Sequence, residues 1–225
     1  MGKLVFVAFG DSLTVGYQSQ IRGDEWPRPT PYTQFLKEKT EKMLDQRGAG
    51  SLRVEFLNRG VVGELTEDMV KRFDRDVLRS RSDAVIIRGG SNDLGWEHEP
   101  HSVARNLARM YDEALVHRIQ PVSCTVPLVF GFDEGVQPRL QLNQLIKKYS
   151  AEHDIVCVDL FSATGDSLTG RLKEEYSNDG LRLNPPGYET MAEAIFSDAV
   201  SGMVSKRLRE MSNHRTTVLH QESPP

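Results

Sequence analysis

The sequence predicts an α/β fold in which a five-stranded parallel sheet lies between two layers of helices, a three-layer sandwich. Short apolar segments rich in β-branched residues alternate with longer segments of helical periodicity, as expected for strands joined by helical crossovers. The 225 residues suit one domain, and a hydrophobic content of 38% is enough for a full core. One globular domain over 1–211 is therefore expected, followed by a flexible tail over 212–225.

The elements of the first half follow one another in strict alternation. Residues 4–9 form a nearly continuous apolar run, which is typical of a strand buried on both faces. A helix is expected from Pro31 to about Gln46, and the next strand over 53–57. Apolar residues at helical spacing predict a helix over 69–77, and a β-branched run predicts a strand over 84–87.

The second half repeats the same alternation. Apolar residues at helical spacing predict helices over 103–114, 142–149 and 188–195. Between them, two short β-branched runs predict strands over 121–126 and 155–158. Right-handed crossovers through these helices would make all five strands parallel.

Composition and charge exclude several classes of function. The net charge of −4 leaves no basic patch for nucleic acid, which would need clustered Lys and Arg. The apolar run at 4–9 is far shorter than the ~20 residues that a membrane-spanning helix needs. We therefore expect a cytoplasmic protein without a membrane span, and the sequence leaves its oligomeric state undetermined.

Neither a metal nor a cofactor is expected. Cys124 and Cys157 each lie in a short apolar run, which predicts buried thiols rather than a disulfide or a metal site. None of the six histidines lies at ligand spacing from another plausible ligand. Phosphate-binding glycine patterns are also absent after the first strand.

Polar clusters follow the first three expected strands. These clusters are residues 10–14 (Gly-Asp-Ser-Leu-Thr), 58–63 (Asn-Arg-Gly-Val-Val-Gly) and 89–93 (Gly-Gly-Ser-Asn-Asp). Each cluster alone is compatible with a turn or a helix cap. Together, at the carboxyl ends of parallel strands, they offer a hydroxyl nucleophile, glycine amides and a donor amide, which are the components of an acyl-transfer site.

With these blocks the sequence resembles the SGNH, or GDSL, hydrolases, a family of serine esterases, lipases, thioesterases and acetylesterases. The resemblance runs from Phe9 almost to Phe196. It rests on 10–13 (Gly-Asp-Ser-Leu), on Gly63, on 90–93 (Gly-Ser-Asn-Asp) and on a fourth block that begins at Asp179. The resemblance implies a flavodoxin-like fold and, as substrate, a small-molecule carboxylic ester.

The resemblance also implies roles for individual residues. Ser12 would attack the ester carbonyl, and the backbone amides of Ser12 and Gly63 with the Asn92 side chain would form the oxyanion hole. Each such donor lowers the barrier by on the order of 3 kcal/mol. Asp179 would orient the general base. The implied reaction is hydrolysis of esters with small or medium acyl groups through an acyl-serine intermediate.

The third catalytic position departs from the family's pattern, because Arg182 stands where the family has its general-base histidine. A guanidinium keeps its protons at any pH at which proteins work and has no acceptor lone pair, so it cannot take the proton of Ser12. Three interpretations follow: an enzyme with impaired activity, an enzyme in which another histidine serves as base, or a non-catalytic binding protein. In the third, Arg182 pairs with Asp179 and presents a cation to an anionic or acylated ligand.

Two further sets of residues complete the candidates. The replacement base would be His98 or His101, or, if the tail folds back, His214 or His220. Asp11 and Asp93 are expected to brace their loops by accepting hydrogen bonds. Five further side chains could line the acyl or alcohol pocket: Trp26, Pro27, Pro29, Phe130 and Phe132.

Overall fold

A computed structural model describes residues 2–19, 27–128, 135–166 and 171–221, with the backbone alone for 214–221. Its centre is a sheet of five parallel strands in the order β2-β1-β3-β4-β5. This is the flavodoxin-like order, and the predicted fold is confirmed. The strands are β1 (Gly2–Gly10), β2 (Leu52–Gly60), β3 (Ala84–Arg88), β4 (Gln120–Cys124) and β5 (Val156–Val158).

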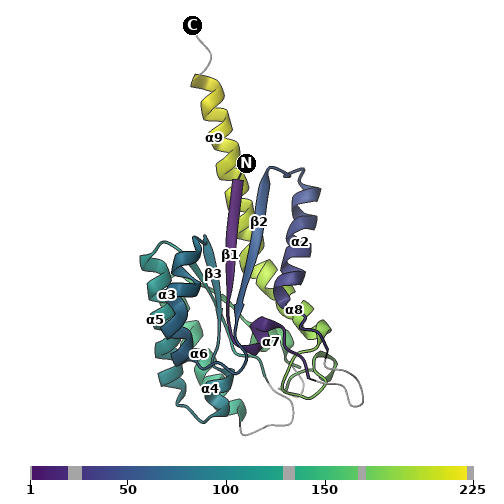
Figure 1. Cartoon of the computed structure of the whole chain (residues 1–225), viewed down its shortest axis with the longest axis vertical. Helices are drawn as coiled ribbons and strands as arrows, with labels where there is room; N and C mark the ends of the chain where they lie inside the picture. Colours follow the sequence, from purple (N-terminus) through teal and green to yellow (C-terminus); the bar gives the residue numbers. More distant parts are fainter. Residues whose placement is uncertain (1, 20–26, 129–134, 167–170, 222–225) are drawn as a thin grey trace.

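Helices cover both faces of the sheet (Figure 1). One face packs against α2 (Tyr32–Gln46), α8 (Pro185–Ile195), the π-helical segment η4 (Phe196–Val200) and α9 (Ser201–Gln221). The opposite face packs against α3 (Thr66–Asp76), α5 (Pro100–Val116) and α6 (Val136–Glu152). Alternate residues of β1 enter the two cores: Phe6 and Ala8 belong to the first, Val7 and Phe9 to the second.

Within the described ranges, the other helical segments that carry labels are short and lie in the connections. They are α1 (Ser12–Val15), the 3-10 turn η1 (Leu78–Ser80), α4 (Ser91–Gly95), α7 (Leu160–Thr164) and the 3-10 turn η3 (Glu174–Tyr176). Of these, α1 follows β1 directly and α4 follows β3 after two glycines. In the sheet, β2 and β3 lie on opposite sides of β1. The connections that follow β1 and β3 therefore begin at the topological switch point of this strand order.

Register brings three strand ends to one level. Gly10, the last residue of β1, pairs with Gly60 of β2 and with Arg88 of β3. A Cβ atom at Gly10 would lie 2.2 Å from the Arg88 carbonyl oxygen, so only glycine fits there. The loops that follow these strands therefore begin side by side.

Several strand and helix bounds differ from the predicted ones. The fourth strand ends at Cys124 instead of 126 because the Asn143 side chain of α6 bonds both the N–H and the carbonyl of Val126, at 2.7 and 3.0 Å. The helix expected over 142–149 begins at Val136. Pro185 starts α8, with the Asn184 side chain accepting from the Gly187 N–H at 3.1 Å.

The end of the chain also differs. Backbone of α9 stays helical through Gln221, into the stretch 212–225 that the sequence predicts as a tail. The last side chains of α9 described against the core are Leu208 and Met211. A domain boundary at 211 remains a prediction.

Two expected absences can be compared with the structure over the described ranges only. Within them, no three His, Cys, Asp or Glu side chains gather as a metal site would require. Nor does any helix there combine the length and apolar character needed to cross a bilayer. Both cysteines are free thiols; Cys124 is buried and Cys157 is half-buried.

Candidate active site

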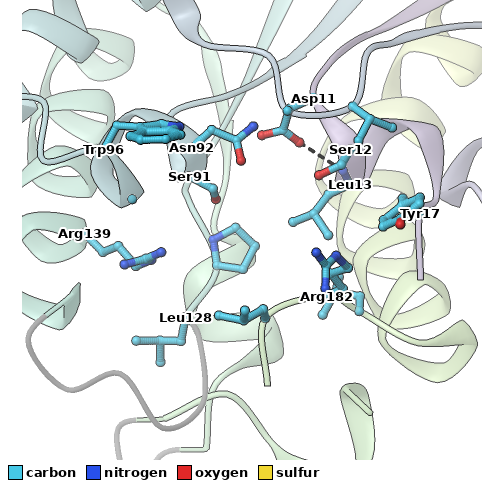
Figure 2. Close-up of a pocket in the computed structure, with 16 residues that line it drawn as sticks. Asp11, Ser12, Leu13, Tyr17, Ser91, Asn92, Trp96, Leu128, Arg139 and Arg182 are labelled. Carbon is cyan, nitrogen blue, oxygen red and sulfur yellow. Dashed lines mark hydrogen bonds between the residues drawn. The ribbon is translucent and has the colours of Figure 1, made fainter. Parts of the chain in front are cut away.

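A cavity of about 500 Å³ opens at the carboxyl ends of the strands (Figure 2). Its volume lies in the range of small-molecule sites, roughly 300–1,000 Å³. The lining includes Ser12, Gly63, Asn92 and Arg182, four residues that lie far apart in the sequence. The loops after β1, β2 and β3 and the fourth sequence block therefore meet around one space. Its other lining residues are Asp11, Leu13, Tyr17, Val62, Ser91, Gly95, Trp96, Pro127, Leu128, Arg139, Leu181 and Leu183.

Ser12 is the first residue of α1, a helix of four residues. Asp11 caps it, accepting from the Leu13 N–H at 3.0 Å, and Gly16 ends it with φ +82°. Left-handed backbone of this kind favours glycine. Within the part of the chain that the structure describes, neither the hydroxyl nor the backbone N–H of Ser12 makes a hydrogen bond. Both groups are therefore available to a ligand in the cavity.

A buried ion pair holds the loop that carries Ser12. Arg88 Nη1 and Nη2 lie 2.5 and 3.2 Å from the two carboxylate oxygens of Asp11, and both side chains are almost fully buried. Asp11 thus accepts from Arg88 and Leu13 together. This is the bracing role that the sequence predicts for Asp11.

The loop after β2 is tied to the nucleophile loop through Asn58. The Asn58 side chain donates to the Thr14 carbonyl at 2.6 Å and accepts from the Gly60 N–H at 2.9 Å. Three residues further on, Gly63 has φ +75° and lines the cavity. Among the described contacts its N–H has no acceptor, so it can donate to a bound group.

Asn92 supplies the side-chain amide of the cavity. Its Nδ2 donates one hydrogen to the Glu64 carbonyl at 2.9 Å, which leaves its second hydrogen for a ligand. Asp93, the next residue, is buried and points elsewhere: its carboxylate accepts from the N–H and the hydroxyl of Thr66. The structure thus places Asp93 as a brace, as predicted.

The fourth block is a tight loop organised by Asp179. One carboxylate oxygen accepts from the backbone amides of Leu181 and Arg182 at 2.9 and 2.8 Å, and the other accepts from the Arg182 guanidinium at 2.6 Å. Partial burial alone would raise the pKa of Asp179. These donors outweigh it and hold the pKa below its ordinary value.

Arg182 lies in the cavity wall beside Tyr17, with its guanidinium carbon 5.3 Å from the centre of the Tyr17 ring (Figure 2). It therefore occupies the place that the resemblance gives to the general base. Its ion pair with Asp179 is the one expected from the sequence. The pair offers donors to the cavity but no proton acceptor on residue 182.

No histidine belongs to the described lining of the cavity. His98 is exposed, and its Nδ1 lies 3.9 Å from the Asp93 carboxylate. His101 is exposed in the first turn of α5. Neither of these two candidate bases reaches the site, and the side chains of His214 and His220 lie outside the described residues.

Of the five side chains expected to line the acyl or alcohol pocket, two belong to the described residues and three do not. Pro27 is half-buried and Pro29 exposed, and neither lines the cavity. Trp26, Phe130 and Phe132 lie outside the described residues.

Sequence reasoning missed several residues of the site. Arg88 could have been noticed, because it ends an otherwise apolar strand just before two glycines. Trp96, 74% exposed at the cavity rim, follows the third block with no pattern that marks it. Arg139 lies near the start of α6, before the helix predicted over 142–149, and nothing in the neighbouring sequence indicates that it faces the cavity.

Comparison with known proteins identifies the class to which this fold and site belong. The chain belongs to the GDSL-like lipase/acylhydrolase family, whose model matches residues 8–190. The predicted SGNH/GDSL membership is thereby confirmed, and a hydrolase of ester type is supported.

Individual proteins and solved structures are also similar to this chain. An uncharacterized lipoprotein, YqeF of Bacillus subtilis, is 31% identical over 132 residues, 56% of this chain; the match spans 49% of that protein. The crystal structure of a lipase/acylhydrolase from Enterococcus faecalis is 26% identical with a TM-score of 0.67, covering 95% of this chain and 97% of its own. An alpha/beta hydrolase from the metagenome of Lake Arreo, Spain, shares the fold at 20% identity and TM-score 0.70, over 88% of this chain and 94% of its own.

Proposed function

We propose that this protein hydrolyses carboxylic esters of small or medium acyl groups through an acyl-serine intermediate on Ser12. The observation that carries the proposal is the cavity. It brings the Ser12 hydroxyl, which has no hydrogen-bond partner among the described residues, together with the backbone N–H groups of Ser12 and Gly63 and with the Asn92 amide. Such donors stabilise negative charge that develops on a carbonyl oxygen.

The reaction begins with attack of Ser12 Oγ on the ester carbonyl carbon. The new C–O bond turns the carbonyl oxygen into an oxyanion, which the three donors hold. Collapse of this intermediate expels the alcohol and leaves an acyl-serine, and water then releases the acid. The apolar rim of Val62, Trp96 and Leu181, all more than half exposed, suits the hydrocarbon part of the ester.

Proton transfer is the weak step of this mechanism. The described cavity lining has no imidazole, so water must accept the Ser12 proton and water must protonate the leaving group. Loss of the base leaves roughly 10³- to 10⁴-fold catalysis over water in serine hydrolases, from binding and the oxyanion hole. We therefore expect slow turnover.

A binding protein for a small anionic or acylated ligand is the second candidate. One observation favours it: Arg182 is already paired with Asp179 and fills the position of the base. In this alternative the cavity holds the ligand without forming a bond to Ser12. The cytoplasmic location expected from the sequence likewise stays a prediction.

The two candidates differ in the reactivity of Ser12. We expect a fluorophosphonate probe to label this chain and to fail on the Ser12→Ala variant, as intact-protein mass spectrometry would show. An unlabelled chain whose ligand affinity is unchanged by Ser12→Ala would favour the binding protein instead.

The restoring substitution is Arg182→His. An imidazole at residue 182 could donate to Asp179 and accept the Ser12 proton, so hydrolysis of a short-chain aryl ester should rise about 10²- to 10⁴-fold. The base works only when neutral. The rate should therefore increase with pH through the imidazole pKa, ordinarily about 6.5 and raised by the Asp179 carboxylate.

Arg182→Gln is the matched control, because it removes the cation without adding a base. It should leave the rate within a few-fold of the original chain. If Arg182→His raises the rate of hydrolysis no more than this control does, impaired proton transfer does not limit that rate.

A further inference from the structure

Arg139 is a second cation in the wall of the cavity that contains Ser12. It belongs to α6, and the residue is only 5% exposed. Figure 2 shows its guanidinium directed into the cavity from the side opposite Arg182 and Tyr17. Arg139 therefore faces the same bound molecule as Ser12, from another wall.

The bonding of Arg139 is incomplete. Its Nη1 donates to the Gly135 carbonyl at 2.9 Å, and its buried Nε has no partner. Across the described residues, no carboxylate lies within ion-pair distance of it. Burial lowers the pKa of Arg139, yet an arginine side chain stays protonated in proteins.

The other two buried arginines near the site show what Arg139 lacks. Arg88 is paired with Asp11, and Arg72 is paired with Glu64 and Asp76. Buried charges in proteins are normally paired because removing an ion from water is costly. Arg139 is the exception among these three.

The remaining charges of the cavity are already compensated. Asp11 is neutralised by Arg88, and Arg182 by Asp179. The described lining therefore has one uncompensated charge, the cation of Arg139. A planar guanidinium fork matches the two oxygens of a carboxylate or phosphate group.

We propose that Arg139 determines substrate specificity by binding an anionic group, a carboxylate or a phosphate, on the ester that Ser12 attacks. The substrates would then be esters that carry a negative charge on their acyl or alcohol part. This inference rests on the proposed function only in its assignment of the ligand as an ester. The anion site itself can be tested without turnover.

The binding experiment uses the Ser12→Ala chain and measures thermal shift and calorimetric affinity. Its probes are the para-nitrophenyl monoester of succinic acid against para-nitrophenyl pentanoate, and para-acetoxybenzoate against para-acetoxytoluene. At least one charged ester should bind about 10- to 100-fold more tightly than its neutral partner, as expected for charge-assisted hydrogen bonds. Succinate and inorganic phosphate, added separately, show which anion the site takes.

Arg139→Met should abolish that preference, and Arg139→Lys should retain part of it. The methionine keeps an apolar stem and removes an unpaired buried charge, so the melting temperature should stay level or rise. Lys148→Met, an exposed position on the same helix, is the control and should keep the preference. Equal binding of charged and neutral esters by the parent chain, or a preference that survives Arg139→Met, would overturn the proposal.

Hydrolysis separates this proposal from the first one. In the Arg182→His background, the ratio of kcat/KM for charged over neutral ester should fall about 10- to 100-fold on Arg139→Met. An anion preference in binding without hydrolysis of any ester would refute the esterase and leave the anion site standing. Hydrolysis of charged and neutral esters without preference would support the esterase and refute the anion site.

Discussion

Single residues decide how firmly the nucleophile loop is held. Arg88 and Asp11 are 77 positions apart in the sequence and form an ion pair that is almost entirely out of water. Desolvation of two charges is costly, and it is offset only while both partners are present. The pair therefore joins the end of β3 to the residue before Ser12.

Removing one partner should be more harmful than removing both. Arg88→Met leaves the Asp11 carboxylate buried and unpaired, so the free energy of unfolding should fall by about 3–5 kcal/mol. In the double variant Arg88→Met with Asp11→Asn, the loss should be smaller than for Arg88→Met alone. Urea unfolding of the single variant, the double variant and the parent chain measures this. A single-variant loss under about 1 kcal/mol would show that the pair contributes little.

At the scale of elements, α3 holds in place the loops that supply the oxyanion donors. Its Arg72 bonds both carboxylate oxygens of Glu64, donates to the Gly10 carbonyl at 3.2 Å and lies 4.1 Å above the Phe9 ring. Glu64 in turn follows Gly63, and its carbonyl accepts from Asn92. One guanidinium thus links the loops after β1 and β2, and through Glu64 also holds Asn92 after β3.

Removing the Arg72 contacts should slow the reaction of Ser12 without changing any residue that lines the cavity. Arg72→Gln should reduce the rate at which a fluorophosphonate labels Ser12 by about 10- to 100-fold, because misplacement of donors by about 1 Å has effects of that size. Arg75→Gln, an exposed neighbour that also pairs with Asp76, is the control and should label at the parent rate. Equal rates for both variants would mean that the loops hold their geometry without Arg72.

At the scale of the whole molecule, strand order and the final helix set the shape. The order β2-β1-β3-β4-β5 puts β1 between its two partners, so the loops after β1 and β3 lie at the switch point where ligands bind in such sheets. At the other end of the sheet, α9 runs past the start of β1 (Figure 1). Met211 packs there so closely that a Cβ at Gly2 would lie 2.4 Å from its sulfur.

Shortening the chain tests where the folded domain ends. A chain ending at residue 213 should melt within about 2 °C of the full chain, because the described apolar contacts of α9 end at Met211. A chain ending at 207 also loses Leu208 and Met211. It should melt about 5–10 °C lower, from roughly 1–2 kcal/mol per side chain. Calorimetry measures the melting temperatures. An equal decrease in both shortened chains would place the end of the folded domain beyond residue 213.

Local patterns were enough for most of the fold. Periodicity located all five strands and five of the long helices, because strand and helix periods are properties of consecutive residues. Strand ends were less predictable: β4 stops early because Asn143, which lies in another element, takes over the bonds of Val126. Nothing in the residues around Val126 indicates that partner.

By itself the sequence determined the parallel α/β class, the family and the residues that meet at the strand ends, including the absence of a base at residue 182. These features reside in short contiguous motifs whose glycines and polar side chains have local requirements. Tertiary structure alone decided that Arg88 pairs with Asp11, that Arg72 reaches Glu64, and that Arg139 faces the cavity unpaired. Whether a buried charge finds a counter-charge depends on which elements pack together, and only the assembled fold brings those elements into contact.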